Sequence, residues 1–351
     1  MDLQRLRCRR GQCLVLGLVG CLLCIVVLSL SYPLQDIAGC SIPSPVVDIS
    51  MLCQEAKRKC NLNLKSGESQ LHHVNPQVNP PGHPPGGEHS DSNDVGQSSH
   101  KMALIVPYRD RLEELLEFVP YMHNYLNEKH IAHRIYVVNQ VDNFRFNRAS
   151  LINVGFLESR SDCDYIAMHD VDLLPLNPDL DYGYPEDGPF HVASPEYHPK
   201  YNYSKFVGGI LLMNKDNFIQ VNGMSNRYWG WGREDDELYV RLLKARLQIK
   251  RPVGLRTGRK DTFLHNHSTM RARDNKRYFN QTRLTSRLDR ETGVSTVKYS
   301  VDRRVNLAIE GAPVTMLNVR LKCDLEKTKW CLKKEDHEKL YRSAASSIMN
   351  N

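Results

Sequence analysis

Residues 165–172 read Tyr165-Ile166-Ala167-Met168-His169-Asp170-Val171-Asp172, an apolar strand pattern that runs into two acids two positions apart. If the extended geometry continues, the carboxylates of Asp170 and Asp172 point the same way at the carboxyl end of the strand. Open α/β sheets bind ligands at that end, and carboxylate and phosphate oxygens can share one divalent cation. The motif therefore indicates a cation bridging to a nucleotide diphosphate. Because Asp-x-Asp also occurs by chance in surface turns, it does not decide the function alone.

Strand and helix patterns alternate on the amino-terminal side of this stretch. Residues 102–107 are a short apolar run typical of a buried strand, and apolar residues then recur near helical spacing over 111–128. Further strands are predicted at 135–138 and 165–168, with a helix at 149–158 between them. Strands that alternate with helices indicate an α/β fold with a mostly parallel sheet.

The folded domain is expected to span residues 101–332. Residues 33–100 lack hydrophobic periodicity, and Pro, Gly, His, Asn and Ser crowd residues 75–97. Such a segment cannot bury enough apolar surface to offset the entropy lost on ordering, so we expect a flexible stem there. The charged residues 333–351 are expected to form a frayed tail.

A membrane anchor is predicted at residues 13–32, which carry no formal charge and are rich in Leu, Val, Ile and Cys. A helix of that length spans the roughly 30 Å of bilayer hydrocarbon. Four arginines precede the run and the first lysine after it is Lys57, so the positive-inside rule places residues 1–12 in the cytosol and the remainder in the lumen. A cleaved signal peptide is the alternative, but the run is longer than a usual h-region and Tyr32-Pro33-Leu34 is a poor cleavage site.

The composition is that of a globular protein, with 351 residues of which 41% are hydrophobic and 25% charged. The net charge of +7 is not gathered into long basic runs, which argues against a nucleic-acid-binding protein. In an oxidising lumen, Cys323 and Cys331 are candidates for a local disulfide because they lie close in sequence. N-glycosylation sequons at Asn202, Asn266 and Asn280 are consistent with that compartment.

A second chemical signal is the run Trp229-Gly230-Trp231-Gly232-Arg233-Glu234-Asp235-Asp236-Glu237. Two tryptophans separated by glycine can stack on the apolar face of a sugar, and the acids at the start of the following helix include a candidate general base. Acids at a helix N-terminus are also expected from the helix dipole alone. A helix cap does not require the two indoles, and we therefore interpret the segment as functional.

A third signal is Phe263-Leu264-His265-Asn266-His267. In an extended segment His265 and His267 face the same side, so that both imidazoles can join one carboxylate on a cation. A histidine is more often an ordinary surface residue, and this pair alone does not decide the matter. With Asp172, the set resembles a Mn²⁺ site better than a Zn²⁺ site because it offers no thiolate.

Together these motifs identify the chain as a member of the β-1,4-galactosyltransferase family over roughly residues 101–331. The resemblance rests on four runs in the expected order: Phe146-Asn147-Arg148-Ala149, Asp170-Val171-Asp172, Val207-Gly208-Gly209 and the segment from Trp229 to Asp236. It implies a GT-A glycosyltransferase fold, a Rossmann-like α/β fold with a mixed, mostly parallel sheet, behind a single transmembrane helix. It also implies an inverting single displacement with UDP-galactose as donor.

The resemblance further implies a role for each matching residue. Asp172, His265 and His267 would hold Mn²⁺, Asp235 would be the catalytic base, and Trp231 would close over donor and acceptor. The donor would contact the strand end at Pro107, Arg109 and Arg111, the pair Phe146 and Arg148, the motif Asp170, Val171 and Asp172, and the glycines Gly208 and Gly209.

For the acceptor, the resemblance is to the branch of the family that acts on xylose of proteoglycan core proteins at the Golgi membrane. Its branch-specific marks are His265-x-His267 and Gly232-Arg233-Glu234. Acceptor contacts are expected from Tyr201, Tyr203, Trp231, Gly232, Glu234, Asp235 and Asp236. A transferase for another UDP-sugar or acceptor and a non-catalytic lumenal sugar-binding protein remain alternatives, although a binding protein would not need Asp235.

Overall fold

The computed structural model describes residues 47–48, 99–267, 272–339 and 342. Nearly all of these fall in one compact unit, which includes residues 97–351. The predicted anchor at 13–32 and most of the predicted stem lie outside the described residues, where only the two-residue strand β1 (Val47–Asp48) is placed. Among the helices that are described, none is long and apolar enough to cross a membrane.

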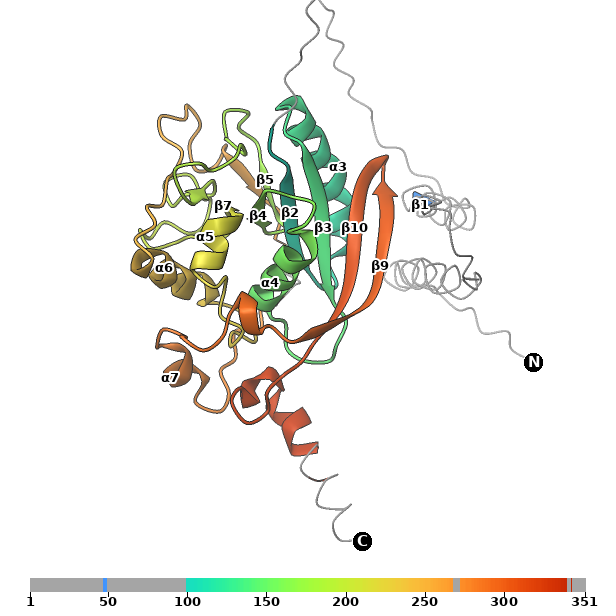
Figure 1. Cartoon of the computed structure of the whole chain (residues 1–351), viewed down its shortest axis with the longest axis vertical. Coiled ribbons are helices and arrows are strands. Elements are labelled where there is room, and N and C mark those ends of the chain that lie inside the picture. Colours follow the sequence, from blue (N-terminus) through green and yellow to red (C-terminus); the bar gives the residue numbers. More distant parts are fainter. Residues whose placement is uncertain (1–46, 49–98, 268–271, 340–341, 343–351) are drawn as a thin grey trace, which may run out of the picture. The chain divides into compact units, whose positions relative to one another are not determined.

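A mixed sheet forms the centre of the unit, with the strand order β9-β10-β3-β2-β4-β7-β6 (Figure 1). The inner strands β10, β3, β2 and β4 pair in parallel, whereas β9, β7 and β6 pair antiparallel. This arrangement confirms the predicted mixed α/β sheet, and its parallel pairs lie at the centre. The strands are β2 (Met102–Tyr108), β3 (His133–Gln140), β4 (Tyr165–His169), β6 (Phe190–His191), β7 (Ile210–Asn214), β9 (Tyr299–Ile309) and β10 (Ala312–Leu321).

Helices α3 (Leu112–Glu128) and α4 (Arg148–Ser159) cover the parallel strands and match the two predicted helices. Strand β2 is buried along its whole length. Its alternate residues Ala103 and Ile105 belong to the same apolar cluster as Leu151, Ile152 and Phe156 of α4. Because side chains alternate across a strand, the residues between them point to the other face. From β2 the chain passes to β3 on one side, and later to β4 on the other side of β2. Because the strand order reverses at this point, a crevice opens at the carboxyl ends of β2 and β4.

One geometric expectation for the Asp-x-Asp motif is wrong. Strand β4 ends at His169, and residues 170–172 form a turn in which the Leu173 amide donates to the Asp170 carbonyl at 3.4 Å. The extended backbone therefore does not continue, and the two carboxylates have different partners. Asp170 pairs with Arg148, while Asp172 faces the two histidines.

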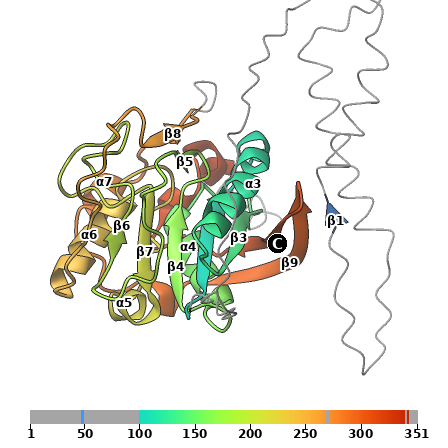
Figure 2. The ribbon, with the colours of Figure 1, turned by 90° about the horizontal axis from the view of Figure 1, so that it is seen from above.

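A small second sheet places the histidines. Strand β5 (Leu173–Pro175) pairs antiparallel with β8 (Phe263–His265), so that Leu173 lies opposite His265 (Figure 2). The Asn266 amide then donates to the Asp172 carbonyl at 2.8 Å. Two segments about ninety residues apart thereby meet at the end of β4.

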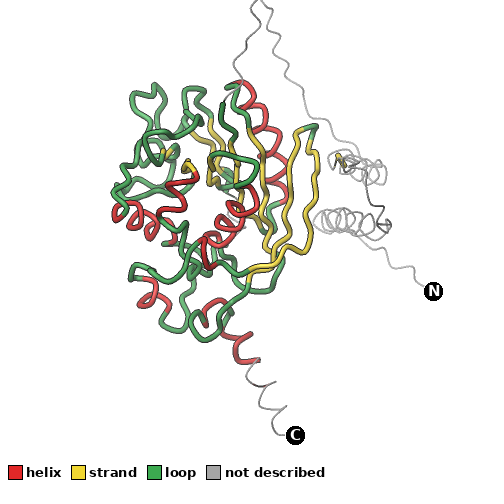
Figure 3. The backbone as a smooth tube through the Cα atoms, in the orientation of Figure 1, coloured by secondary structure: helices red, strands yellow, loops and turns green. Residues whose placement is uncertain are grey.

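The remaining elements are short, and loops make up much of the chain between β4 and β9 (Figure 3). Cys323 and Cys331 form the predicted disulfide. Residues 334–339 of the predicted tail are helical. The other elements are α5 (Lys215–Gln220), α6 (Glu234–Lys244), α7 (Gln281–Thr285) and the 3₁₀ helices η1 (Val294–Thr296) and η2 (Lys329–Cys331).

Candidate active site

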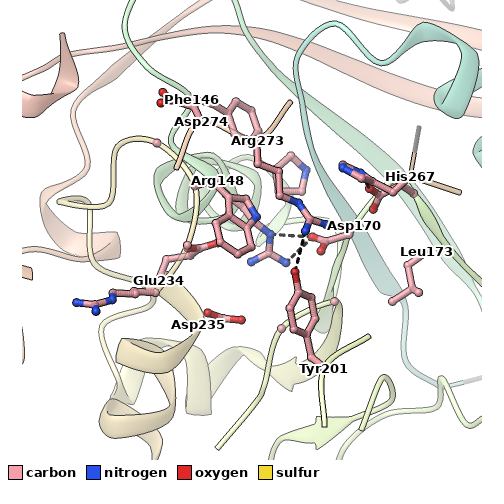
Figure 4. A pocket seen from close by; sticks show the side chains of 18 of the residues that line it. Phe146, Arg148, Asp170, Leu173, Tyr201, Glu234, Asp235, His267, Arg273 and Asp274 are labelled. Atoms are coloured by element: carbon pink, nitrogen blue, oxygen red, sulfur yellow. Dashed lines mark hydrogen bonds and ion pairs between the residues drawn. The ribbon is translucent and has the colours of Figure 1, made fainter. Parts of the chain in front are cut away.

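One cavity of about 680 Å³ opens at the carboxyl ends of β2 and β4. Every residue predicted to act in catalysis, donor binding, acceptor binding or metal binding lines it. Figure 4 shows side chains from distant segments directed into this space, with Arg148 and Asp170 close to Tyr201 and Arg273. The fold therefore brings together residues spread over more than 150 positions of the chain.

Asp172, His265 and His267 form a cluster whose ligand atoms lie within 4.8 Å of one another. Nδ1 of His267 is 2.9 Å from a carboxylate oxygen of Asp172, and Nε2 of His265 is 3.8 Å from the same oxygen. Burial lowers the pKa of His265, although the Asp172 carboxylate opposes the shift. A neutral imidazole is the form that binds a metal ion. One carboxylate and two imidazoles, without a thiolate, suit Mn²⁺.

The donor side of the cavity is built on the start of α4. Asn147 caps this helix by accepting a hydrogen bond from the Ser150 amide at 2.9 Å, which fixes the direction of Arg148. Nε and Nη2 of Arg148 both lie 2.7 Å from one carboxylate oxygen of Asp170. Burial alone would lower the pKa of Arg148, but the carboxylates of Asp170, Glu234 and Asp235 raise it overall. A permanent positive charge thus stands among three acids.

Arg109 lines the cavity, yet its guanidinium is occupied. It donates to the carbonyl oxygens of Gln140, Asp142 and Phe144 at 3.1, 2.8 and 2.7 Å. The guanidinium carbon Cζ of Arg109 also lies 6.0 Å from the ring centre of Phe146. Arg109 therefore holds the loop that leads to Phe146. Of the other two predicted residues at this strand end, Pro107 lies in β2, and Arg111 precedes α3 and lies 3.4 Å from Glu114.

The candidate base is in the first turn of α6. Burial, and then the neighbouring carboxylate of Glu234, raise the pKa of Asp235 to about 7, while Arg148 opposes the shift. Burial likewise raises the pKa of Glu234. A Cβ atom built on Gly208 would lie 2.4 Å from a carboxylate oxygen of Asp235, so this position needs glycine for the acid to sit where it does. Gly209 follows with a φ of +75°.

Aromatic side chains form the acceptor side. The Tyr203 hydroxyl donates to Asp236 at 3.0 Å, and Arg273 donates to the Tyr201 hydroxyl at 3.0 Å. Phe206 lies between the two tyrosines, with ring centres 5.0 and 5.5 Å away. Trp231 is 43% exposed although indoles are on average well buried, so part of its ring is accessible to a ligand.

Several lining residues were not predicted from the sequence. Arg273 lies 5.0 Å from the ring centre of Trp231. Arg277 donates to the Trp231 carbonyl at 2.8 Å, and Asp274 and His198 also line the cavity. The basic run over 271–277 was a visible signal, but nothing local to it shows that it folds against the tryptophans.

The chain matches two family models. Residues 53–184 match the model of the N-terminal region of glycosyl transferase group 7. Residues 188–266 match the model described as the N-terminal domain of galactosyltransferase.

Curated relatives match most of the chain. Mouse β-1,4-galactosyltransferase 7 is 57% identical over 76% of this chain and 80% of its own length. The Drosophila melanogaster protein of the same name is 56% identical, over 68% of this chain and 74% of its own length. The xylosylprotein 4-β-galactosyltransferase of Caenorhabditis elegans is 47% identical, over 70% of this chain and 86% of its own length.

Two solved structures of the Drosophila β-1,4-galactosyltransferase 7 also resemble the chain. The catalytic domain in complex with xylobiose has a TM-score of 0.66 at 55% identity and covers 67% of this chain and all of that one. A mutant in complex with manganese, UDP-Gal and xylobiose has the same TM-score and identity, over 66% of this chain and 99% of that one. With relatives this similar along most of their length, the chain belongs to the β-1,4-galactosyltransferase family.

Proposed function

We propose that this chain transfers galactose from UDP-galactose in β-1,4 linkage to xylose on proteoglycan core proteins, with Mn²⁺ as cofactor. The observation that carries the proposal is that one cavity holds a metal-binding triad, a half-buried acid with a raised pKa and an aromatic wall. The relatives named for xylosylprotein galactosyl transfer, and the Drosophila complex with manganese, UDP-Gal and xylobiose, support the choice of donor, metal and acceptor.

Asp172, His265 and His267 would hold the Mn²⁺ ion. When bound, Mn²⁺ neutralises negative charge on the diphosphate of the leaving group. The triad fits this role because its ligand atoms already converge and its carboxylate and imidazole chemistry suits Mn²⁺. Arg148 adds a second positive charge that does not depend on pH, and Phe146 offers a ring against which the uracil can pack.

Asp235 would act as the base in a single displacement. As the xylose hydroxyl oxygen attacks C1 of galactose, its proton passes to the carboxylate of Asp235. The bond from C1 to the diphosphate oxygen breaks, and its electron pair leaves with UDP. Attack on the face opposite the leaving group converts the α-linkage of the donor into a β-linkage in the product.

Trp231, Tyr201 and Tyr203 would form the xylose pocket. An indole and two phenol rings stack well on the apolar face of a sugar, and the Tyr203–Asp236 and Arg273–Tyr201 hydrogen bonds fix the rings. A pocket walled by such rings favours a pentose over a sugar with an exocyclic CH₂OH. Gly232 and Glu234 border the same wall.

We also propose that the enzyme is a single-pass type II protein of the Golgi membrane, with its catalytic domain in the lumen. The uncharged apolar run at residues 13–32, the arginines before it and the lumenal sequons support this placement. The disulfide between Cys323 and Cys331 is also compatible with an oxidising compartment.

The test is an assay of the catalytic domain with UDP-galactose, Mn²⁺ and a β-xyloside, run beside a panel of other UDP-sugars and acceptors. Transfer from UDP-galactose to the xyloside should exceed every other combination. Faster transfer from UDP-N-acetylgalactosamine would indicate a different donor. Uridine nucleotide binding without any transfer would indicate a sugar-binding protein.

A further inference from the structure

Arg145 is a buried arginine that connects residues 274–281, next to the cavity, with the segment at Trp330. Its side chain is 1% exposed. Nε and Nη2 contact the two carboxylate oxygens of Asp274 at 2.7 and 3.0 Å, which is the bidentate geometry that only a guanidinium provides. The remaining donors contact the Gln281 side chain at 3.1 Å, the Trp330 carbonyl at 3.0 Å and the Lys276 carbonyl at 2.7 Å.

The segment that Arg145 holds is the one that contacts the backbone of Trp231. The Trp231 amide donates to the Asp274 carbonyl at 2.8 Å, and Arg277 donates to the Trp231 carbonyl at 2.8 Å. Gln281 donates to the Trp229 carbonyl at 2.9 Å. Both peptide groups of Trp231 are therefore bonded to residues 274–277, whose own position depends on Arg145.

Gly230 shows how closely the tryptophan loop packs on Arg145. Its φ is +84°, and a Cβ atom built on it would lie 2.0 Å from Nη2 of Arg145. On the same side, the Gly230 amide donates to the Phe146 carbonyl at 2.8 Å. The tryptophan loop is thus held against both Arg145 and Phe146. A shift of Arg145 would therefore move the indole of Trp231.

We propose that Arg145 is a positioning residue for the acceptor site, which acts through Asp274 and the backbone of residues 274–277 to fix the indole of Trp231. Arg145 does not itself line the cavity, so its effect on the reaction is indirect. The inference rests on the proposed transfer to xylose. It adds to that proposal a residue outside the cavity that determines how well the acceptor is bound.

The first measurement uses Arg145→Lys. Lysine keeps the positive charge but cannot form the bidentate contact or reach the separate acceptors at once. We expect the KM for a β-xyloside to rise and kcat to fall, with a combined loss in kcat/KM of about 10- to 100-fold, because small misplacements of a positioning group cost that much. The affinity for UDP in the presence of Mn²⁺, measured by calorimetry, should stay close to that of the wild type.

The matched control is Arg241→Lys. Arg241 is also buried and donates to several carbonyl oxygens, those of Val221, Asn222, Gly223, Asp289 and Thr292, but no contact among the described residues joins it to Trp231. It should lower the melting temperature as Arg145→Lys does, without the same rise in the KM for the xyloside. An equal rise in both variants would mean that Arg145 acts only on general stability, and would overturn the proposal.

A double-mutant cycle tests whether Arg145 acts through Trp231. In a Trp231→Ala background, Arg145→Lys should change kcat/KM for the xyloside very little, because the group that it positions is gone. A loss in that background as large as in the wild type would overturn the proposal. If Arg145→Lys does not fold, Asp274→Asn replaces it in the same cycle, with the same two outcomes. The Asp274 carboxylate is about one-third exposed, so this substitution should disturb folding less. Failure of the wild type to transfer to the xyloside would refute the proposed function instead.

Discussion

At the scale of single residues, Asp235 and Asp236 are adjacent carboxylates with different surroundings. Asp236 accepts a hydrogen bond from Tyr203, whereas Asp235 lies against Gly208 with a raised pKa. Asp235→Asn keeps the size of the side chain but removes the proton acceptor. We expect kcat for transfer to a β-xyloside to fall by roughly 10²- to 10⁴-fold or more, because general base catalysis contributes a factor of that size. UDP affinity should survive, because the metal ligands are elsewhere.

Asp236→Asn is the matched control for that substitution. It weakens the contact to Tyr203 and should mainly raise the KM for the acceptor. If folded Asp235→Asn retained activity within about tenfold of the wild type, which is less than a general base supplies, the base would have been assigned to the wrong residue.

The raised pKa of Asp235 also predicts a pH dependence. A base acts only when deprotonated, so kcat/KM should rise about tenfold per pH unit below the pKa of about 7 and level off above it. A folded-state pKa above the unfolded value of about 3.9 means that protonated Asp235 contributes stability at low pH, which is lost as the pH rises through about 7. Asp235→Asn should therefore raise the melting temperature more at about pH 8 than at about pH 5. A flat rate profile over that range would contradict the assignment.

At the scale of elements, the β5–β8 pair holds the proposed metal site, since the turn before β5 carries Asp172 and β8 ends at His265. Asp172→Ala or His267→Ala removes one of three ligands, and we expect turnover to be abolished and added Mn²⁺ to rescue it poorly. Titration of activity and of Mn²⁺ binding is the measurement. His123→Ala, on α3 outside the cavity, should leave the Mn²⁺ dependence unchanged. If the wild-type rate were the same in a chelator as in Mn²⁺, the reaction would not depend on a metal ion.

The sequon at Asn266 lies between the two histidines, directly after the end of β8. Its side-chain amide donates to Glu117 of α3 at 2.8 Å, and its backbone amide is bonded to Asp172. A glycan there would displace this contact and crowd the metal site. All three sequon asparagines are exposed, but we expect Asn266 to be unmodified because of these contacts, while Asn202 and Asn280 remain open to modification. Glycopeptide mapping of the active enzyme that finds Asn266 substantially occupied would contradict the placement of the histidines.

The elements were predictable where one local pattern sufficed. The apolar run at 102–107 and the helical spacing of 111–128 fall within β2 and α3, give or take a residue. The turn at 170–172 was not predictable, because it depends on where Asp172 meets His267, which lies 95 positions away. The roles of Arg109 and Arg145 were also hidden, since each is set by carbonyl groups of loops whose course a sequence pattern does not give.

At the scale of the whole molecule, all of the described residues that line the cavity fall between Pro107 and Arg277. A variant that lacks residues 1–98 should therefore keep the kcat and KM of the full-length enzyme toward a soluble β-xyloside. In cells, the same variant behind a cleavable signal peptide should be secreted rather than retained, because the proposed anchor is absent. Assays of purified protein and of culture medium check the two parts. A large loss of activity on the soluble acceptor would show that residues 1–98 contribute to catalysis.

The close approach of Gly208 to Asp235 has a consequence for inherited variation. Any amino acid other than glycine at position 208 brings a Cβ atom onto the carboxylate of the proposed base. A single missense change in this codon would thus push the carboxylate of Asp235 out of its present position and lower activity, although every reacting group is still encoded. Because the change acts on the carboxylate of the proposed base, a screen based on galactosyl transfer should detect the allele more readily than a screen based on protein abundance.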